Sequence, residues 1–295
     1  MNNVSISTTS LPRLESSNFY ELSSTIKMMN RFLKESKVDG FEFVLLPEWD
    51  SENPPLTPTS APSECEKHIV KEIIETLQTR NFPILSVHAN RDIGNYLCSE
   101  DAEKVRKGIR LIKESLDFTQ KVNSKICVFH FWDTWKETFD LRSLQNLYQR
   151  FQGMHPEIEI SIENIPTKYK NKTPFQITQF FRYKTVDLKW ASLFNEFDLF
   201  VEIIEQVNNV HIQGECQDGS VVPSLGSLNY EQALRKIKET GYSGVFTIEL
   251  EGKANYNDVL KYVKKLKKIL KLGKVLSNQP TTLRLTGIFD FAEKL

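Results

Sequence analysis

Residues 158–166 read IEISIENIP, and this stretch shows a pattern that recurs along the chain. Ile158, Ile160 and Ile162 alternate with polar residues, which is the two-residue period of a strand with one apolar face. The strand ends at Glu163, where an Asn-Ile-Pro turn follows. A carboxylate at the last inward position of a buried strand is costly unless a partner compensates its charge. The ends of the other strands indicate what that partner is.

Strand-like runs alternate with amphipathic segments along the chain. The predicted strands cover residues 3–8, 41–46, 83–88, 125–130, 158–163, 184–188, 208–213 and 245–250. Between them, segments such as 63–80 and 101–122 carry apolar residues at helical spacing. Thr173 is a predicted N-cap with a capping box, and Gly241 a predicted helix end. Eight such units predict a (β/α)8 TIM barrel. The alternative is a doubly wound sheet, but no glycine-rich turn follows the first strand.

Two segments exceed what a minimal barrel needs. We expect residues 1–272 to form a single barrel domain and residues 273–295 to be a C-terminal extension. The extension would pack on the barrel or at a subunit interface, and the second arrangement would make the protein a homo-oligomer. Residues 47–63 form a loop rich in proline and serine after the second strand, and this loop is a candidate lid over an active site.

The composition narrows the class of protein. The chain has 295 residues, of which 40% are hydrophobic, and 38 basic residues balance 38 acidic ones. This balance gives no global attraction to nucleic acid or to a membrane surface. The four cysteines show neither paired spacing nor a C-x-x-C motif, so no disulfide framework or thiolate zinc site is predicted. No signal peptide or membrane-spanning run is recognisable, and we expect a cytoplasmic protein.

Six of the eight predicted strands carry a ligand-type residue at or near their ends. These residues are His88, His130, Glu163, Asp187, His211 and Glu249. Their neighbours are mainly apolar, so the alternation of side chains turns the polar residues toward the barrel axis. Any one of them alone would more often be a hydrogen-bonded residue at the rim. Several carboxylates with imidazoles in one space instead predict a divalent-metal site, suited to Mn²⁺, Zn²⁺, Co²⁺ or Mg²⁺.

Aromatic and basic residues also follow the strand ends. Trp49, Trp132 and Trp190 are predicted to line a substrate pocket, because indole faces bind the C–H faces of sugar rings or bases. We interpret Trp135 as a residue that only roofs the barrel. Lys168 lies in a lysine-rich loop after the fifth strand, which we interpret as a solvated loop rather than an anion site.

Several motifs make the chain resemble a known family. They are SVHAN, SIENIP, TVDLKWA, VHIQGE and the run LGSLNYEQALRKIKETGYSGVFTIELEG. With these motifs, residues 3–270 resemble the xylose isomerase-like TIM-barrel superfamily, which includes sugar isomerases and epimerases, inosose dehydratases and endonuclease IV. The resemblance implies that one metal ion is held by four residues, namely Glu163, Asp187, His211 and Glu249. It also implies that the two glutamates exchange protons with the substrate.

The chain departs from the family pattern at two substrate contacts. Trp190 stands where the family often has histidine, and Gln217 stands where the epimerases often have an arginine that binds substrate hydroxyls. His88, His130 and Glu163 resemble one zinc site of endonuclease IV. The third zinc site of that enzyme is missing, because Trp190 and the segment SVVPS occupy its positions.

These observations predict a metal-dependent isomerase or epimerase that acts on a sugar or related polyol carbonyl compound through an enediolate. Glu163 and Glu249 would be the catalytic acid and base. His88 and His130 would bind substrate or a second cation, and Gln217 would contact substrate. Nucleic acid is not the expected partner. The alternatives are a dehydratase, a phosphodiester hydrolase of the endonuclease IV type, and a relative that binds without catalysing a reaction.

Overall fold

The structure is a computed structural model that describes residues 2–15, 20–36, 38–56, 65–252 and 254–272. The proposed C-terminal extension, residues 273–295, therefore lies outside the described residues, as does part of the candidate lid. None of the described helices combines the length and apolar character that crossing a bilayer requires.

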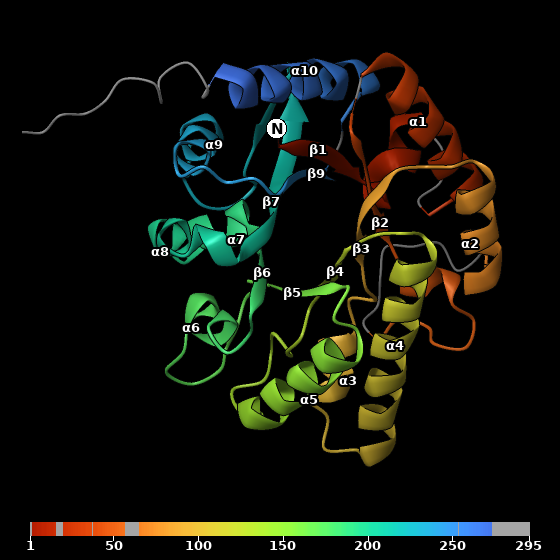
Figure 1. Ribbon diagram of the computed structural model, residues 1–295, viewed down its shortest axis with the longest axis vertical. Helices are drawn as coiled ribbons and strands as arrows, with labels where there is room; N and C mark the ends of the chain where they lie inside the picture. Colours follow the sequence, from red (N-terminus) through yellow and green to blue (C-terminus); the bar gives the residue numbers. More distant parts are fainter. Residues whose placement is uncertain (1, 16–19, 37, 57–64, 253, 273–295) are drawn as a thin grey trace, which may run out of the picture.

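Eight parallel strands close into a barrel (Figure 1). They are β1 (Asn3–Ser7), β2 (Gly40–Val44), β3 (Ile84–His88), β4 (Ile126–Phe129), β5 (Glu159–Glu163), β6 (Tyr183–Asp187), β7 (Val207–Gln217) and β9 (Val245–Glu251). Neighbours in sequence pair with one another, β9 pairs with both β1 and β7, and the pairing of β6 with β7 completes the ring. The predicted (β/α)8 barrel is confirmed.

Helices surround the strands. The longer ones are α1 (Leu22–Glu35), α2 (Val70–Thr79), α4 (Ala102–Lys121), α5 (Leu141–Met154), α9 (Tyr230–Glu239) and α10 (Tyr256–Leu272). The shorter ones are α3 (Ile93–Leu97), α6 (Pro174–Thr178), α7 (Leu188–Leu193), α8 (Phe197–Glu202) and the 3₁₀ turns η1 (Thr8–Glu15), η2 (Pro47–Trp49) and η3 (Ile204–Gln206). The capping box at Thr173 is confirmed, and Gly241 has the positive φ of 86° expected after α9.

Two local predictions differ from the structure. Helix α2 begins at Val70 rather than near residue 63, because the preceding chain bonds to η2. The His68 amide donates to the Trp49 carbonyl, and Lys67 Nζ donates to the Glu48 carbonyl. The chain beyond residue 213 continues as strand and turns back as β8 (Ser220–Val222), antiparallel to the end of β7.

The turn of this hairpin is Asp218-Gly219, and both residues have positive φ. An Asp-Gly pair between extended segments is a recognised hairpin signal that the sequence analysis missed.

The interior of the barrel is polar, whereas the space between strands and helices is apolar. Buried side chains from neighbouring strands bond to one another inside the ring. Ser5 bonds to Thr247 at 2.7 Å, and Thr247 donates to Asn209 at 2.8 Å. Because alternate residues of each strand point inward, this polar layer continues into the side chains at the carboxyl ends of the strands.

Candidate metal centre and substrate pocket

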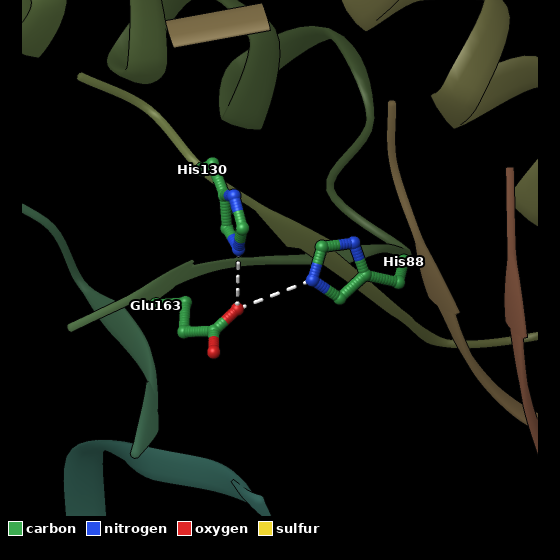
Figure 2. A group of neighbouring side chains, drawn as sticks. All are labelled: His88, His130 and Glu163. Atoms are coloured by element: carbon green, nitrogen blue, oxygen red, sulfur yellow. Dashed lines mark hydrogen bonds and ion pairs between the residues drawn. The ribbon is translucent and has the colours of Figure 1, made fainter. Parts of the chain in front are cut away.

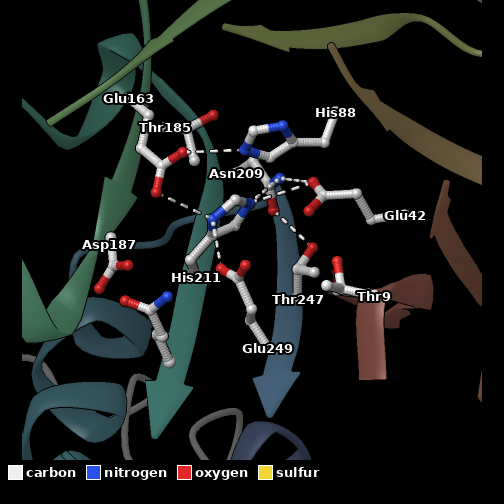
Figure 3. Close-up of polar contacts among 12 residues, drawn as sticks. Thr9, Glu42, His88, Glu163, Thr185, Asp187, Asn209, His211, Thr247 and Glu249 are labelled. Carbon is white, nitrogen blue, oxygen red and sulfur yellow. Dashed lines mark hydrogen bonds and ion pairs between the residues drawn. The ribbon is translucent and has the colours of Figure 1, made fainter. Parts of the chain in front are cut away.

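Four strands bring four ligand-type side chains to one point (Figure 3). Glu163 ends β5, Asp187 ends β6, His211 lies in β7 and Glu249 in β9. Asp187 is paired in register with His211, which fixes their common height in the barrel. Each of the four residues offers one ligand atom, and these atoms all lie within 4.8 Å of one another. The structure thus brings together all four residues that the sequence analysis grouped.

Asp187 is held by the chain around it. Its Oδ1 accepts from the amides of Lys189 at 2.7 Å and Trp190 at 3.4 Å, and so caps α7. The Asn164 side chain bonds to both the amide and the carbonyl of Asp187, at 2.6 and 3.2 Å. Asp187 Oδ2 is buried and accepts no hydrogen bond from any described residue. A rigid carboxylate therefore keeps one oxygen available for a ligand.

His211 is oriented by carboxylates on both sides of its ring. Nδ1 lies 3.3 Å from Glu163 Oε1 and 3.3 Å from Glu249 Oε2, but makes no well-aligned hydrogen bond within the described chain. Nε2 lies 3.1 Å from Glu42 Oε2. A proton on Nε2 would be donated to Glu42 and would leave the lone pair of Nδ1 facing the other carboxylates. This is the tautomer of a metal-binding histidine.

The electrostatics of this group favour a cation. Burial and the nearby charges of Glu163 and Glu249 raise the pKa of Asp187 well above its ordinary value. Burial also raises the pKa of Glu163, but His211 and His130 outweigh it and lower that pKa well below the ordinary value. Three carboxylates in one space repel one another unless a positive charge lies among them. The unpaired Asp187 Oδ2 and His211 Nδ1 supply two ligand atoms, so the residues fit a divalent metal ion.

Glu42 is a buried carboxylate that the sequence analysis did not select. It lies on β2 and is fully buried, and its Oε2 accepts from Ser86 Oγ at 2.8 Å and Asn209 Nδ2 at 2.9 Å as well as facing His211. A signal was present, because Glu42 interrupts an apolar strand, between Phe41 and Phe43. Glu42 lies in the middle of its strand, whereas the six predicted ligand-type residues lie at or near strand ends.

A second group shares Glu163 with the first (Figure 2). Glu163 Oε2 lies 3.2 Å from His88 Nε2 and 3.0 Å from His130 Nε2. His88 Nδ1 lies 2.9 Å from the Ala89 carbonyl, so both ring nitrogens face acceptors. Burial lowers the pKa of His88, but its hydrogen bond to Glu163 and the charge of that carboxylate outweigh burial and raise the pKa to about 9. Without a metal ion, these two acceptors favour the protonated form of the His88 ring.

A cavity of about 580 Å³ opens above these side chains. Glu163, Glu249, His130 and Gln213 line its inner end. Trp190 lines it, as the sequence analysis predicted.

Trp135 also lines this cavity, so its interpretation as a mere roof of the barrel requires correction. Lys168, which we assigned to a solvated loop, is exposed and lines the cavity too, with Nζ 4.7 Å from the Trp135 ring centroid.

Four of the residues predicted to contact substrate do not line this cavity, namely His88, Trp49, Trp132 and Gln217. Trp49 is buried beside Phe43, where its indole donates to the Tyr20 carbonyl, and it lines a separate cavity of about 40 Å³. Trp132 is buried and donates to the Pro166 carbonyl at 3.0 Å, which ties together the loops after β4 and β5. Gln217 lies on the hairpin and lines another cavity. Hydrogen bonds to backbone carbonyls therefore orient the indoles of Trp49 and Trp132.

Known structures resemble most of the chain. A D-tagatose 3-epimerase-like protein is 18% identical, with a TM-score of 0.62, and the match covers 92% of this chain and 98% of that one. The 3-keto-D-glucoside 4-epimerase YcjR from E. coli is 11% identical, with a TM-score of 0.58 and coverage of 91% and 100%. The IolI protein with a bound zinc atom is 14% identical, with a TM-score of 0.56 and coverage of 92% and 96%.

These identities are low enough that the likeness shows the fold alone. No curated protein sequence matches the chain significantly. A family model does match, over residues 31–267, which is most of the barrel. The chain therefore belongs to the xylose isomerase-like TIM barrel family.

Proposed function

We propose that the protein is a divalent-metal-dependent isomerase or epimerase that acts on a sugar or related polyol carbonyl compound. The observation that carries this proposal is the convergence of Glu163, Asp187, His211 and Glu249 beside a cavity of about 580 Å³, which Glu163 and Glu249 line. Family membership and structural neighbours that include sugar epimerases support it.

The four residues would hold one cation, with Mn²⁺ or Zn²⁺ as the first candidates and Mg²⁺ or Co²⁺ as alternatives. When bound, the ion would polarise the substrate carbonyl and stabilise the enediolate that forms after deprotonation. His211 would keep its proton on Nε2 through Glu42, and Asp187 would be fixed through Asn164. Both ligands are thus oriented before substrate arrives, which lowers the cost of assembling the site.

Glu163 and Glu249 would carry the proton transfers. A carboxylate oxygen of each lies 3.3 Å from His211 Nδ1, and both residues line the cavity. One carboxylate would remove the proton beside the carbonyl, and the other would deliver a proton to the product. The Glu249 side chain is 18% exposed and that of Glu163 only 3%. Glu249 is therefore better placed to exchange its proton with water.

Metal analysis and solvent exchange test the proposal. The purified protein should contain a divalent metal or bind Mn²⁺ stoichiometrically. In D₂O it should then incorporate deuterium next to the carbonyl of at least one member of a panel of ketoses, keto-glycosides and inososes, followed by NMR. Asp187→Asn should lose both properties, whereas Glu48→Gln should keep both, because Glu48 is a buried carboxylate that pairs with Arg91. Stoichiometric metal without any exchange across the panel would contradict the proposed reaction.

His88, His130 and Glu163 support a second proposal, that a further cation binds beside the first. Two metal ions per chain, falling to one in His130→Ala, would establish it; one ion in both proteins would assign the histidines to substrate. A two-metal site would also make the phosphodiester hydrolase worth testing, by cleavage of abasic DNA. We expect no cleavage, because the composition gives no attraction to nucleic acid.

A further inference from the structure

The cavity has two chemically different ends. Its inner end carries the polar side chains of Glu163, Glu249, His130 and Gln213. Its outer end is formed by the loops after β4 and β5 and by α7 with its C-cap, and its lining there is largely apolar. The apolar residues are Trp135, Ile165, Pro166, Trp190 and Phe194. A polyhydroxylated chain can satisfy the inner end, whereas the hydrogen-bonding side chains that line the outer end are Thr134, Thr167 and Lys168.

The cavity is also larger than a simple sugar requires. A water molecule takes about 30 Å³ of liquid, so 580 Å³ corresponds to roughly 19 water molecules. This exceeds the number of non-hydrogen atoms in a hexose, and bonded atoms pack more closely than separate waters. A free ketohexose held at Glu163 and Glu249 would leave the outer end filled with solvent.

The aromatic side chains at the outer end are not fully buried. Trp135 is 67% exposed, although tryptophan is usually well buried in folded proteins. Its described ring contact is the Lys168 ammonium at 4.7 Å. The Trp190 amide donates a hydrogen bond to Asp187 Oδ1, and Lys189 Nζ lies 4.3 Å from the centroid of the Trp190 ring. These two contacts hold Trp190 in place. An exposed indole beside a pocket, such as that of Trp135, is typical of a surface that binds a ring.

We infer that the substrate is a sugar that carries an apolar or ring-shaped substituent, such as the aglycone of a keto-glycoside, and that Trp135, Trp190 and Phe194 bind this substituent. This inference rests on the proposed function for the sugar end of the ligand. It assigns the outer end of the same cavity to the substituent, because Trp135 and Trp190 supply aromatic surface there. Lys168 lies over one of these rings, so an electron-rich or weakly anionic substituent is favoured.

Matched ligands test the substituent separately from the reaction. Methyl and phenyl 3-keto-β-D-glucopyranosides share the sugar and the carbonyl and differ only in the aglycone. Their dissociation constants are measured by calorimetry on the Mn²⁺-loaded protein, and deuterium incorporation beside the carbonyl is followed in parallel. The phenyl compound should bind about tenfold more tightly, as contacts with two indoles would give.

Two variants test whether Trp135 causes the preference for the phenyl compound. Trp135→Ala should reduce the ratio of phenyl to methyl affinity by about threefold or more, and its exposed position puts the fold at little risk. Phe180→Ala is the matched control, because Phe180 also lies under a lysine, Lys172 at 5.4 Å, but does not line the cavity. The ratio in Phe180→Ala should equal that of the wild type.

The outcomes separate the two proposals. A phenyl preference that depends on Trp135 supports the inference, even if neither compound exchanges deuterium, in which case the proposed reaction fails alone. Equal affinities, no detectable binding of either compound, or a preference that Trp135→Ala leaves intact would overturn the inference. Deuterium exchange together with equal affinities for the methyl and phenyl compounds would support the proposed reaction and contradict the inference about the substituent.

Discussion

The hydrogen bonds of Glu42 predict that a residue with no contact to the metal ion controls its affinity. Glu42 Oε2 faces His211 Nε2 at 3.1 Å and also accepts from Ser86 and Asn209. Glu42→Gln keeps the shape of the side chain and an oxygen at this position, because three donors surround it. The change removes the negative charge that holds the His211 proton on Nε2. Nδ1 then becomes a weaker ligand.

The size of the effect follows from these contacts. A hydrogen bond to a charged group contributes about 1.5–3 kcal/mol and a neutral one about 0.5–1.5 kcal/mol. The loss of roughly 1–1.5 kcal/mol at His211 corresponds to about tenfold weaker metal binding. The new amide nitrogen would replace Glu42 Oε1, which has no hydrogen-bond partner among the described residues. A buried donor without an acceptor should lower the free energy of unfolding by a further 1–3 kcal/mol or so.

Calorimetric titration of the metal-free protein with Mn²⁺ measures the affinity, and urea unfolding measures the stability. Glu48→Gln is the control, because Glu48 is 2% exposed and accepts from Arg91 Nη1 at 3.0 Å, away from the four ligand residues. This control should lose stability but bind Mn²⁺ as the wild type does. If Glu42→Gln also bound Mn²⁺ with wild-type affinity, Glu42 would have only a structural role, and our assignment of the His211 tautomer would be wrong.

Four further predictions concern the site and the buried charges. Asp187→Asn should weaken metal binding by more than the roughly 100-fold upper range of outer-shell changes, measured by calorimetry. Glu163→Gln and Glu249→Gln should each slow deuterium exchange on the order of 10² to 10⁴-fold while metal affinity falls less; normal exchange in both would exclude the two-carboxylate mechanism. Chelation should lower the melting temperature, since metal at 100 times its Kd stabilises the fold by about 2.7 kcal/mol. Burial lowers the pKa of Lys184 to about 8 from its ordinary value of 10.5, so the native state binds fewer protons than the unfolded state between these pH values, and the stability of the protein should rise as the pH rises through them. Lys184→Met should remove that gain in urea unfolding at pH 7.5 and 10.

Local sequence patterns were sufficient to predict the barrel and the four converging residues. The alternation of apolar and polar residues in a strand depends only on its own residues, and a parallel barrel brings all strand ends to one face. The parity of Glu163, Asp187, His211 and Glu249 therefore predicted their meeting point, although these residues come from four separate strands. Metal binding at that point stays a prediction.

The tertiary structure decided which residues surround that point. Glu42 and His211 are 169 positions apart, and only the closure of the barrel brings them to hydrogen-bonding distance. Trp49 and Trp135 both follow strand ends, yet a bond to the Tyr20 carbonyl draws Trp49 into the core while Trp135 lines the cavity. Loop side chains follow no fixed period, and their direction depends on partners distant in sequence. For this reason the sequence determines the position of the four candidate metal ligands, and only the folded chain determines the shape and chemistry of the pocket beside them.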